Sequence, residues 1–93
     1  MIRSFKDSET ESVINRTPVR KFALDLQRRA RRKLIMVDDA ENLNDLRVPP
    51  GNHLEKLEGG RRGQHCIRIN RQWRICFVWQ DGDAYDVEIV DYH

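Results

Sequence analysis

Five side chains in the last third of the sequence have the types needed for chemistry on a phosphodiester. Arg68 and Arg74 lie in two neighbouring segments of alternating polarity, and Asp91, Tyr92 and His93 follow further along. Guanidinium groups match phosphate oxygens in charge and geometry. An imidazole can transfer protons at neutral pH, and the neighbouring phenol and carboxylate can position a substrate or orient the ring. The combination predicts a site that binds phosphate and transfers protons.

Three predicted strands position these side chains. Alternating apolar residues indicate strands over about residues 64–69, 73–79 and 83–92. Because a shift of one residue would turn every side chain to the other face, the apolar pattern of the first hairpin favours a single register. This register pairs Ile69 with Trp73, Ile67 with Ile75, Arg68 with Arg74 and Cys66 with Cys76. The two arginines are therefore expected to lie opposite each other on one face.

The second hairpin is expected to turn at Asp81-Gly82, through a three-residue loop with Gly82 in a left-handed conformation. The resulting register pairs Trp79 with Asp83, Phe77 with Tyr85, Ile75 with Val87, Trp73 with Ile89 and Arg74 with Glu88. One face of the sheet is then apolar and forms the core, with Ile67, Ile69, Trp73, Ile75, Phe77, Tyr85, Val87 and Ile89. The opposite, open face is polar, with Arg68, Arg74, Cys66, Cys76, Asp86, Glu88, Val90 and Tyr92.

Two interpretations of the arginine pair stay open at this point. Opposed like charges repel each other, so a phosphate between Arg68 and Arg74 would turn the repulsion into a binding site. Alternatively, Glu88 neutralises Arg74 in a structural ion pair, which leaves Arg68 without an obvious partner. His93 also has two interpretations, as a proton-transfer group or as a frayed end without a role.

Further basic side chains near the sheet are candidates for holding a nucleic-acid backbone. They are Arg61 and Arg62 in a glycine-flanked loop, Lys56 just before this loop, and Arg71 in the first hairpin turn. The alternative for the loop is an ordinary solvated surface. Trp73 and Trp79 could stack on bases, but their parity places them with the core residues.

Composition limits the remaining possibilities. The 93 residues make one domain, 34% charged and 39% hydrophobic, with a formal net charge of +2. No apolar run approaches the roughly 18 residues of a membrane span, so a cytoplasmic protein without membrane contact is expected. The cysteines, Cys66 and Cys76, are expected to be reduced and partly buried. Together with His53 and His65 they lack zinc-like spacing, so neither a metal nor a cofactor is expected.

The first half of the chain reads as helical. Alternation over residues 2–5 indicates a short strand, and Asp7 is a suitable cap for a helix over about residues 8–15. Thr17-Pro18 predicts the start of a second helix of about five turns, because proline is favoured at the first helical position. Its apolar stripe is Val19, Phe22, Ala23, Leu26, Ala30, Leu34 and Val37, and its solvent face is rich in arginine. Asn42 can cap one more helical turn. Helices followed by strands predict an α+β domain.

Several segments resemble the HigB-type killer proteins of bacterial toxin–antitoxin systems. They are Pro49-Pro50-Gly51-Asn52, Leu54-Glu55-Lys56-Leu57-Glu58-Gly59, Gly63-Gln64, the run from Ile67 to Phe77, and the run from Asp81 to His93. This family belongs to the RelE-like superfamily. The resemblance implies a small α+β fold with an N-terminal strand, two helices and an antiparallel sheet of three further strands. It is loose over residues 6–17.

The resemblance also implies an activity and partners. Such proteins are endoribonucleases that cleave mRNA in the A site of the 70S ribosome, and a cognate helix-turn-helix antitoxin of HigA type inhibits them and carries the operator-binding activity. By this similarity Arg74 and Arg68 bind the phosphate, His93 transfers protons, Tyr92 orients substrate and Asp91 tunes His93. The alternative is a non-catalytic RNA- or protein-binding module on the same fold.

Overall fold

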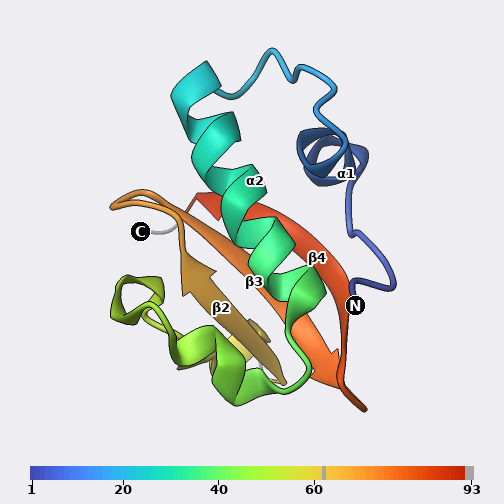
Figure 1. The fold of residues 1–93 in the computed structure, drawn as a ribbon, viewed down its shortest axis with the longest axis vertical. Helices are drawn as coiled ribbons and strands as arrows, with labels where there is room; N and C mark the ends of the chain where they lie inside the picture. The colour runs from blue at the N-terminus through green and yellow to red at the C-terminus, as the bar shows by residue number, and fades with distance from the viewer. Residues whose placement is uncertain (62, 92–93) are drawn as a thin grey trace.

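A computed structural model describes residues 1–61 and 63–91 of the chain. Two helices lie over one face of a four-stranded antiparallel sheet with strand order β1-β2-β3-β4, and Figure 1 shows α2 lying over the strands. The α+β architecture predicted from the sequence is confirmed. The bounds are α1 Ser8–Ile14, α2 Leu24–Asp39, β1 Glu55–Lys56, β2 Gln64–Arg68, β3 Trp73–Gln80 and β4 Asp83–Asp91, with short 3-10 helices η1 Leu43–Arg47, η2 Pro50–Asn52 and η3 Gly59–Arg61.

The N-terminal segment covers the outer edge of β4. It forms two isolated parallel bridges, Ile2 to Ala84 and Phe5 to Val87, in place of the continuous short strand expected over residues 2–5. The amides of Ala84 and Val87 donate to the carbonyls of Met1 and Ser4 at 3.0 and 3.1 Å. Pairing of this kind removes the exposed edge that would otherwise attract other strands.

Helix α1 begins at the predicted residue and is linked to β4, the same edge strand. The Asp7 carboxylate accepts a hydrogen bond from the Thr10 amide at 2.7 Å, which caps the helix. Thr10 is fully buried, and its hydroxyl accepts a hydrogen bond from the amide of Ile89 at 3.0 Å. One side chain therefore joins the helix to the strand that leads to Asp91.

Replacing Thr10 with valine is expected to lower the free energy of unfolding by about 1–3 kcal/mol, because the buried amide of Ile89 would lose its acceptor. Urea unfolding followed by circular dichroism measures the change. Thr17→Val makes the same chemical change at an exposed position and should shift stability by less than about 0.5 kcal/mol. Equal effects of the two substitutions would contradict the role given to the Thr10 hydroxyl.

Helix α2 starts later than predicted. It begins at Leu24, after a turn, and not at Thr17-Pro18. The side chain of Gln27 explains the difference: its amide donates to the carbonyls of Val19 and Phe22 at 2.9 and 2.7 Å, and its oxygen accepts from the Val19 amide at 3.2 Å. These bonds hold residues 19–22 in a compact loop that still buries Val19 and Phe22.

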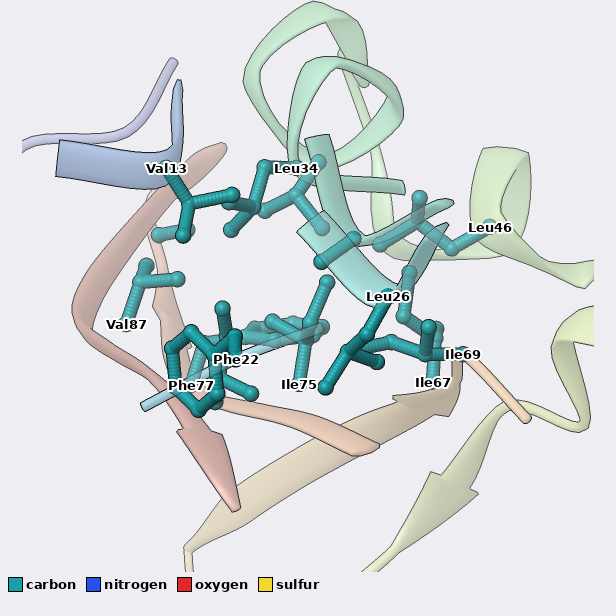
Figure 2. Packing of buried hydrophobic residues seen from close by; sticks show 14 of the residues in the cluster. Val13, Phe22, Leu26, Leu34, Leu46, Ile67, Ile69, Ile75, Phe77 and Val87 are labelled. Carbon is teal, nitrogen blue, oxygen red and sulfur yellow. The ribbon is translucent and has the colours of Figure 1, made fainter. Parts of the chain in front are cut away.

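The core lies between α2 and the inner face of the sheet. Figure 2 shows side chains of both helices, the loop before α2 and the strands meeting in one cluster. The stripe Leu26, Ala30, Leu34 and Val37 is buried as predicted. Trp73 and Trp79 are partly buried against this cluster, in agreement with their predicted core role, and the Trp73 ring meets Phe22 edge-on at 5.4 Å.

The first hairpin has the predicted register. Cys66 lies opposite Cys76, Ile67 opposite Ile75 and Arg68 opposite Arg74, and the Ile69 amide donates to the Trp73 carbonyl at 2.9 Å. The second hairpin differs. Asp81 and Gly82 both have positive φ, 52° and 83°, and form a two-residue turn that pairs Gln80 with Asp83.

A β-bulge between Cys76 and Val78 shifts the rest of this register. The extra residue lies in β4, where Asp86 has φ 52°. Ala84 therefore lies in the core, and Tyr85 lies opposite Val78 on the other face, so the prediction that Tyr85 belongs to the core is wrong. Beyond the bulge, Glu88 lies opposite Cys76, and Arg74 lies opposite Val90. The predicted cross-strand pair of Glu88 with Arg74 is therefore also wrong.

Candidate active site and basic cleft

Arg68 and Arg74 form a cross-strand pair at the end of the sheet where the chain reaches Asp91. The bond from Ile69 to Trp73 marks a hydrogen-bonded pair. Such pairs alternate along an antiparallel ladder, so Arg68–Arg74 and Cys66–Cys76 are non-hydrogen-bonded pairs, in which side chains approach more closely. Both arginines are at positions on the open face of the sheet.

Arg74 is largely buried, with 14% of its side chain exposed. Its Nη1 lies 2.9 Å from Oε1 of Glu55, on the edge strand β1, and 3.4 Å from the sulfur of Cys66. The acidic neighbour of Arg74 is therefore Glu55, in contrast to the predicted Glu88. The bulge in β4 is the physical reason, because it moves Glu88 to a position opposite Cys76.

Glu88 neutralises a different arginine. Its Oε1 lies 2.6 Å from Nη1 of Arg61 and 3.7 Å from Nζ of Lys6. Arg61 also donates to Gln64 at 3.1 Å. This predicted RNA-binding residue is thus fixed by an ion pair within the domain, with 38% of its side chain exposed.

Arg68 faces a different environment from Arg74. Its Nε donates to the carbonyl of Asn70 at 3.0 Å, and it lines a cleft of about 660 Å³ between α2, the η2 segment and the first hairpin turn. We call this the basic cleft; its lining residues are Arg29, Arg32, Lys33, Met36, Gly51, His53, Arg68, Ile69, Asn70 and Arg71. Six of these ten residues are arginine, lysine or histidine, so the cleft favours anionic ligands.

A buried asparagine shapes one wall of the basic cleft. Asn52 donates to the carbonyls of Leu46 and Val48 at 3.2 and 3.3 Å and accepts a bond from Nζ of Lys33 at 2.5 Å. His53 follows in a left-handed conformation with φ 46°. Burial, and next the charge of Arg29, lower the pKa of Lys33. Sequence reasoning missed Lys33 and His53 as site residues, although the motif Pro49-Pro50-Gly51-Asn52 marked the neighbouring segment.

Asp91 ends β4 opposite Trp73 and is exposed. Its parity along β4 matches that of buried Ile89, yet Asp91 itself is exposed. Its carboxylate accepts a hydrogen bond from Gln72 at 3.1 Å, which ties the end of β4 to the turn between Arg68 and Arg74. Tyr92 and His93 follow in the sequence and lie, like Arg62, outside the described residues.

The other predicted RNA contacts are divided between two places. Arg71 is exposed and lines the basic cleft. Lys56 is exposed on β1, opposite His65 on β2. Within residues 1–61 and 63–91, no three His, Cys, Asp or Glu side chains are grouped so as to hold a metal ion. The helices described by the structure are all too short or too polar to cross a membrane.

A family model agrees with the fold. The model described as "RelE-like toxin of type II toxin-antitoxin system HigB" matches residues 3–93. The chain belongs to this family of HigB-like toxins. The resemblance noted in the sequence is thereby confirmed.

Individual relatives support the family assignment. Toxin HigB-1 of Vibrio cholerae is 51% identical over 53 residues, which are 57% of this chain and 56% of that protein. Endoribonuclease HigB of Proteus vulgaris is 42% identical over 40 residues, 43% of this chain and 44% of that protein. The chain thus spans about half the length of the curated relatives it matches.

A solved structure also shares the fold. A chain of the YoeB-YefM complex from Staphylococcus aureus superposes with a TM-score of 0.62 and 15% sequence identity, covering 100% of this chain and 98% of that one. At this level of identity the likeness shows the fold alone, and it confirms the predicted RelE-like architecture.

Proposed function

We propose that the protein is the toxin of a type II toxin–antitoxin system and an endoribonuclease that cleaves translated mRNA in the ribosomal A site. Family membership supports a toxin, and the Proteus vulgaris relative named as an endoribonuclease supports action on RNA. The observation that supports cleavage of a phosphodiester is the pairing of Arg68 with Arg74 on one face of the sheet.

The proposed reaction uses the RNA's own 2′-hydroxyl. The 2′-oxygen attacks the adjacent phosphorus after a base removes its proton, and an acid donates a proton to the departing 5′-oxygen. The products are a 2′,3′-cyclic phosphate and a 5′-hydroxyl. Negative charge builds up on the phosphoryl oxygens in the transition state. A positively charged side chain that is already in position stabilises this negative charge.

Arg74 is assigned this charge stabilisation. Glu55 and Cys66 hold its guanidinium in place at 2.9 and 3.4 Å, so little reorganisation is needed when the phosphate binds. Arg68 is assigned as a second phosphate ligand that connects the reacting phosphate with the basic cleft. A cation fixed in a partly buried site acts more strongly than one in water.

The remaining roles fall to Asp91, the last residue of β4, and to the two residues that follow it in the sequence. We assign proton transfer to His93, substrate orientation to Tyr92 and tuning of His93 to Asp91. The position of Asp91 beside the turn between the arginines supports this assignment, since Tyr92 and His93 follow Asp91 directly in the sequence. General acid–base catalysis by one positioned side chain contributes about 10²–10⁴-fold to a rate.

The basic cleft is proposed to hold the RNA backbone next to the reacting phosphate, with Arg62 and Lys56 as further contacts. Arg29 and Arg71 line opposite sides of it, on α2 and on the hairpin turn. Arg29→Gln and Arg71→Gln should each weaken binding to a single-stranded RNA and lower the slope of log K against log salt by about 0.7–1. Fluorescence anisotropy at several salt concentrations measures both quantities.

Arg20→Gln is the matched control for the cleft. Arg20 is exposed and lies before α2, outside the lining of the cleft. The substitution removes the same charge, so a general electrostatic effect would lower binding equally in all three variants. Such an equal loss would contradict a localised RNA site in the cleft.

The proposed partners are the 70S ribosome with its mRNA and a cognate helix-turn-helix antitoxin of HigA type, with operator DNA bound only through the antitoxin. The direct test is induced expression in cells of wild type, Arg74→Ala and a chain lacking His93. Wild type should arrest growth and produce mRNA 5′ ends at codons in the A site, and both variants should be strongly attenuated. If wild type and both variants are equally harmless, the non-catalytic module is the better account.

A further inference from the structure

A second, small apolar cluster lies on the open face of the sheet, directly beside Arg74. It consists of Leu57, Cys66 and Cys76, with Val90 packed against it. The two cysteines are free thiols with 0% and 2% of their surface exposed. Burial alone is ordinary for cysteine, which packs as a small apolar side chain. The direct opposition of the two thiols has no role in the proposed RNA chemistry.

The two thiols lie in a geometry that a disulfide can bridge. Cys66 and Cys76 are directly opposed in a non-hydrogen-bonded pair, for which the Cα atoms lie about 4.5 Å apart. Disulfides span Cα separations of about 4.4–6.8 Å. Only a small displacement of β2 and β3 is needed to join them.

The positive charge of Arg74 favours oxidation of one of the two thiols, that of Cys66. Hydrogen bonds from Cys76 and from Arg74, whose Nη1 lies 3.4 Å away, lower the pKa of Cys66, although burial opposes them. The same hydrogen bond and burial raise the pKa of Cys76. A thiolate is the nucleophile in thiol oxidation, so Cys66 is the sulfur that reacts first and Cys76 is the resolving thiol.

A short edge strand lies over the cysteine cluster, and a hollow in the protein surface lies next to it. Strand β1, which pairs with β2 at Cys66, has two residues at the edge of the sheet. Cys76 lines a hollow of about 550 Å³ together with Leu57, Arg61 and Val90. A short edge strand opens locally at low cost, and the hollow admits a molecule as small as hydrogen peroxide.

We propose that Cys66 and Cys76 form a reversible disulfide under oxidation by a peroxide, and that this bond slows RNA cleavage. The Cys66 thiolate attacks one peroxide oxygen, which gives a sulfenic acid and releases the other oxygen as water after protonation. The Cys76 thiol then displaces a second water and forms the S–S bond. In total, two thiols and one hydrogen peroxide give one disulfide and two waters.

The effect on activity follows from Arg74. Oxidation converts the Cys66 sulfur, which accepts a hydrogen bond from the Arg74 guanidinium at 3.4 Å, into one half of a disulfide, and thereby changes this contact. The guanidinium then moves away from the position in which the phosphate needs it. This second half of the proposal rests on the proposed function, whereas the formation of the disulfide does not.

The experiment treats the purified full-length protein with hydrogen peroxide, alkylates it under denaturing conditions and measures its mass. Native wild type should lose two hydrogen atoms and both alkylation sites, and dithiothreitol should restore them. Cleavage of ribosome-bound mRNA should fall several-fold on oxidation and recover on reduction. Cys66→Ala, checked for folding by circular dichroism, should cleave at a rate that peroxide does not change. Cys76→Ala should gain one oxygen atom at Cys66 under peroxide and form no intramolecular disulfide.

Two results would overturn the proposal. The first is a folded wild type that keeps both thiols alkylatable while an unfolded sample forms the disulfide at the same peroxide concentration. The second is a complete disulfide with an unchanged cleavage rate, which would remove the regulatory half. A wild type that forms the disulfide but cleaves no RNA even when reduced would refute the proposed function, and the mass change would still establish the modification site.

Discussion

Replacing Arg74 with alanine is expected to reduce the rate of mRNA cleavage by about 10²–10³-fold, the loss typical of removing one group that stabilises transition-state charge. The structure gives the reason for a loss of this size. The guanidinium belongs to a side chain that is only 14% exposed and is held by Glu55 and Cys66, so its positive charge is in position before the phosphate binds. Single-turnover cleavage of a ribosome-bound mRNA measures the change.

Three further variants separate charge stabilisation from a structural role of Arg74. Arg74→Lys keeps the charge without the planar donors and should recover part of the rate. Glu55→Gln leaves Arg74 in place with a weaker tether, so a loss of a few fold is expected. Arg20→Ala removes an exposed arginine and should leave the rate unchanged. If Arg74→Ala is folded and cleaves like wild type, Arg74 is not a catalytic residue.

Removal of the His93 imidazole is expected to have the second large effect. His93→Gln should slow cleavage by about 10²–10⁴-fold, the contribution of one general acid or base. The loss should be in the rate at saturating ribosome complex, because binding of RNA is assigned to the basic residues. The same measurement across a pH range of about 5–9 should lose the limb that depends on imidazole ionisation.

Tyr92→Phe is the companion variant for this prediction. It keeps the ring and removes the hydroxyl, so a smaller loss is expected from a residue that orients substrate. A His93→Gln protein with an unchanged pH profile and rate would show that proton transfer lies elsewhere, and His53, which lines the basic cleft, would then be the next residue to test.

The first hairpin was predictable because a single pattern determined it. The apolar alternation around Ile67 and Ile75 allows one register only, and this register places both the arginine pair and the cysteine pair from the sequence alone. The cap at Asp7 was predictable for a similar reason, since the helix start depends on neighbouring residues alone.

The second hairpin was not predictable from alternation. A two-residue turn at Asp81-Gly82 and a bulge at Asp86 each change the register, and both rest on residues in left-handed conformations that periodicity does not report. The late start of α2 had a different cause. It depends on hydrogen bonds from Gln27 to Val19 and Phe22, which outweigh the local preference of Thr17-Pro18 for a helix start.

One part of the candidate site was predictable from the sequence, and another part was not. The pairing of Arg68 with Arg74 followed from the register of the first hairpin, whereas the place of Asp91 opposite Trp73 did not, because the bulge in β4 shifts the register of the second hairpin. The neighbours of Arg74 did not, because Glu55 comes from an edge strand of two residues. The basic cleft depends on the packing of α2 against the η2 segment, and contacts between distant segments such as Lys33 and Asn52 leave no periodic signal in a sequence.

The central claim is tested most directly by incubating the purified protein with 70S ribosomes that hold a defined codon of an end-labelled mRNA in the A site. Cleavage within that codon, with a 2′,3′-cyclic phosphate on the upstream fragment, is the predicted result, together with slow or no cleavage of the same mRNA without ribosomes. The Arg74→Ala protein should be at least about 10²-fold slower. An intact mRNA on the ribosome, or fragments with equal yield from wild type and Arg74→Ala, would contradict the account.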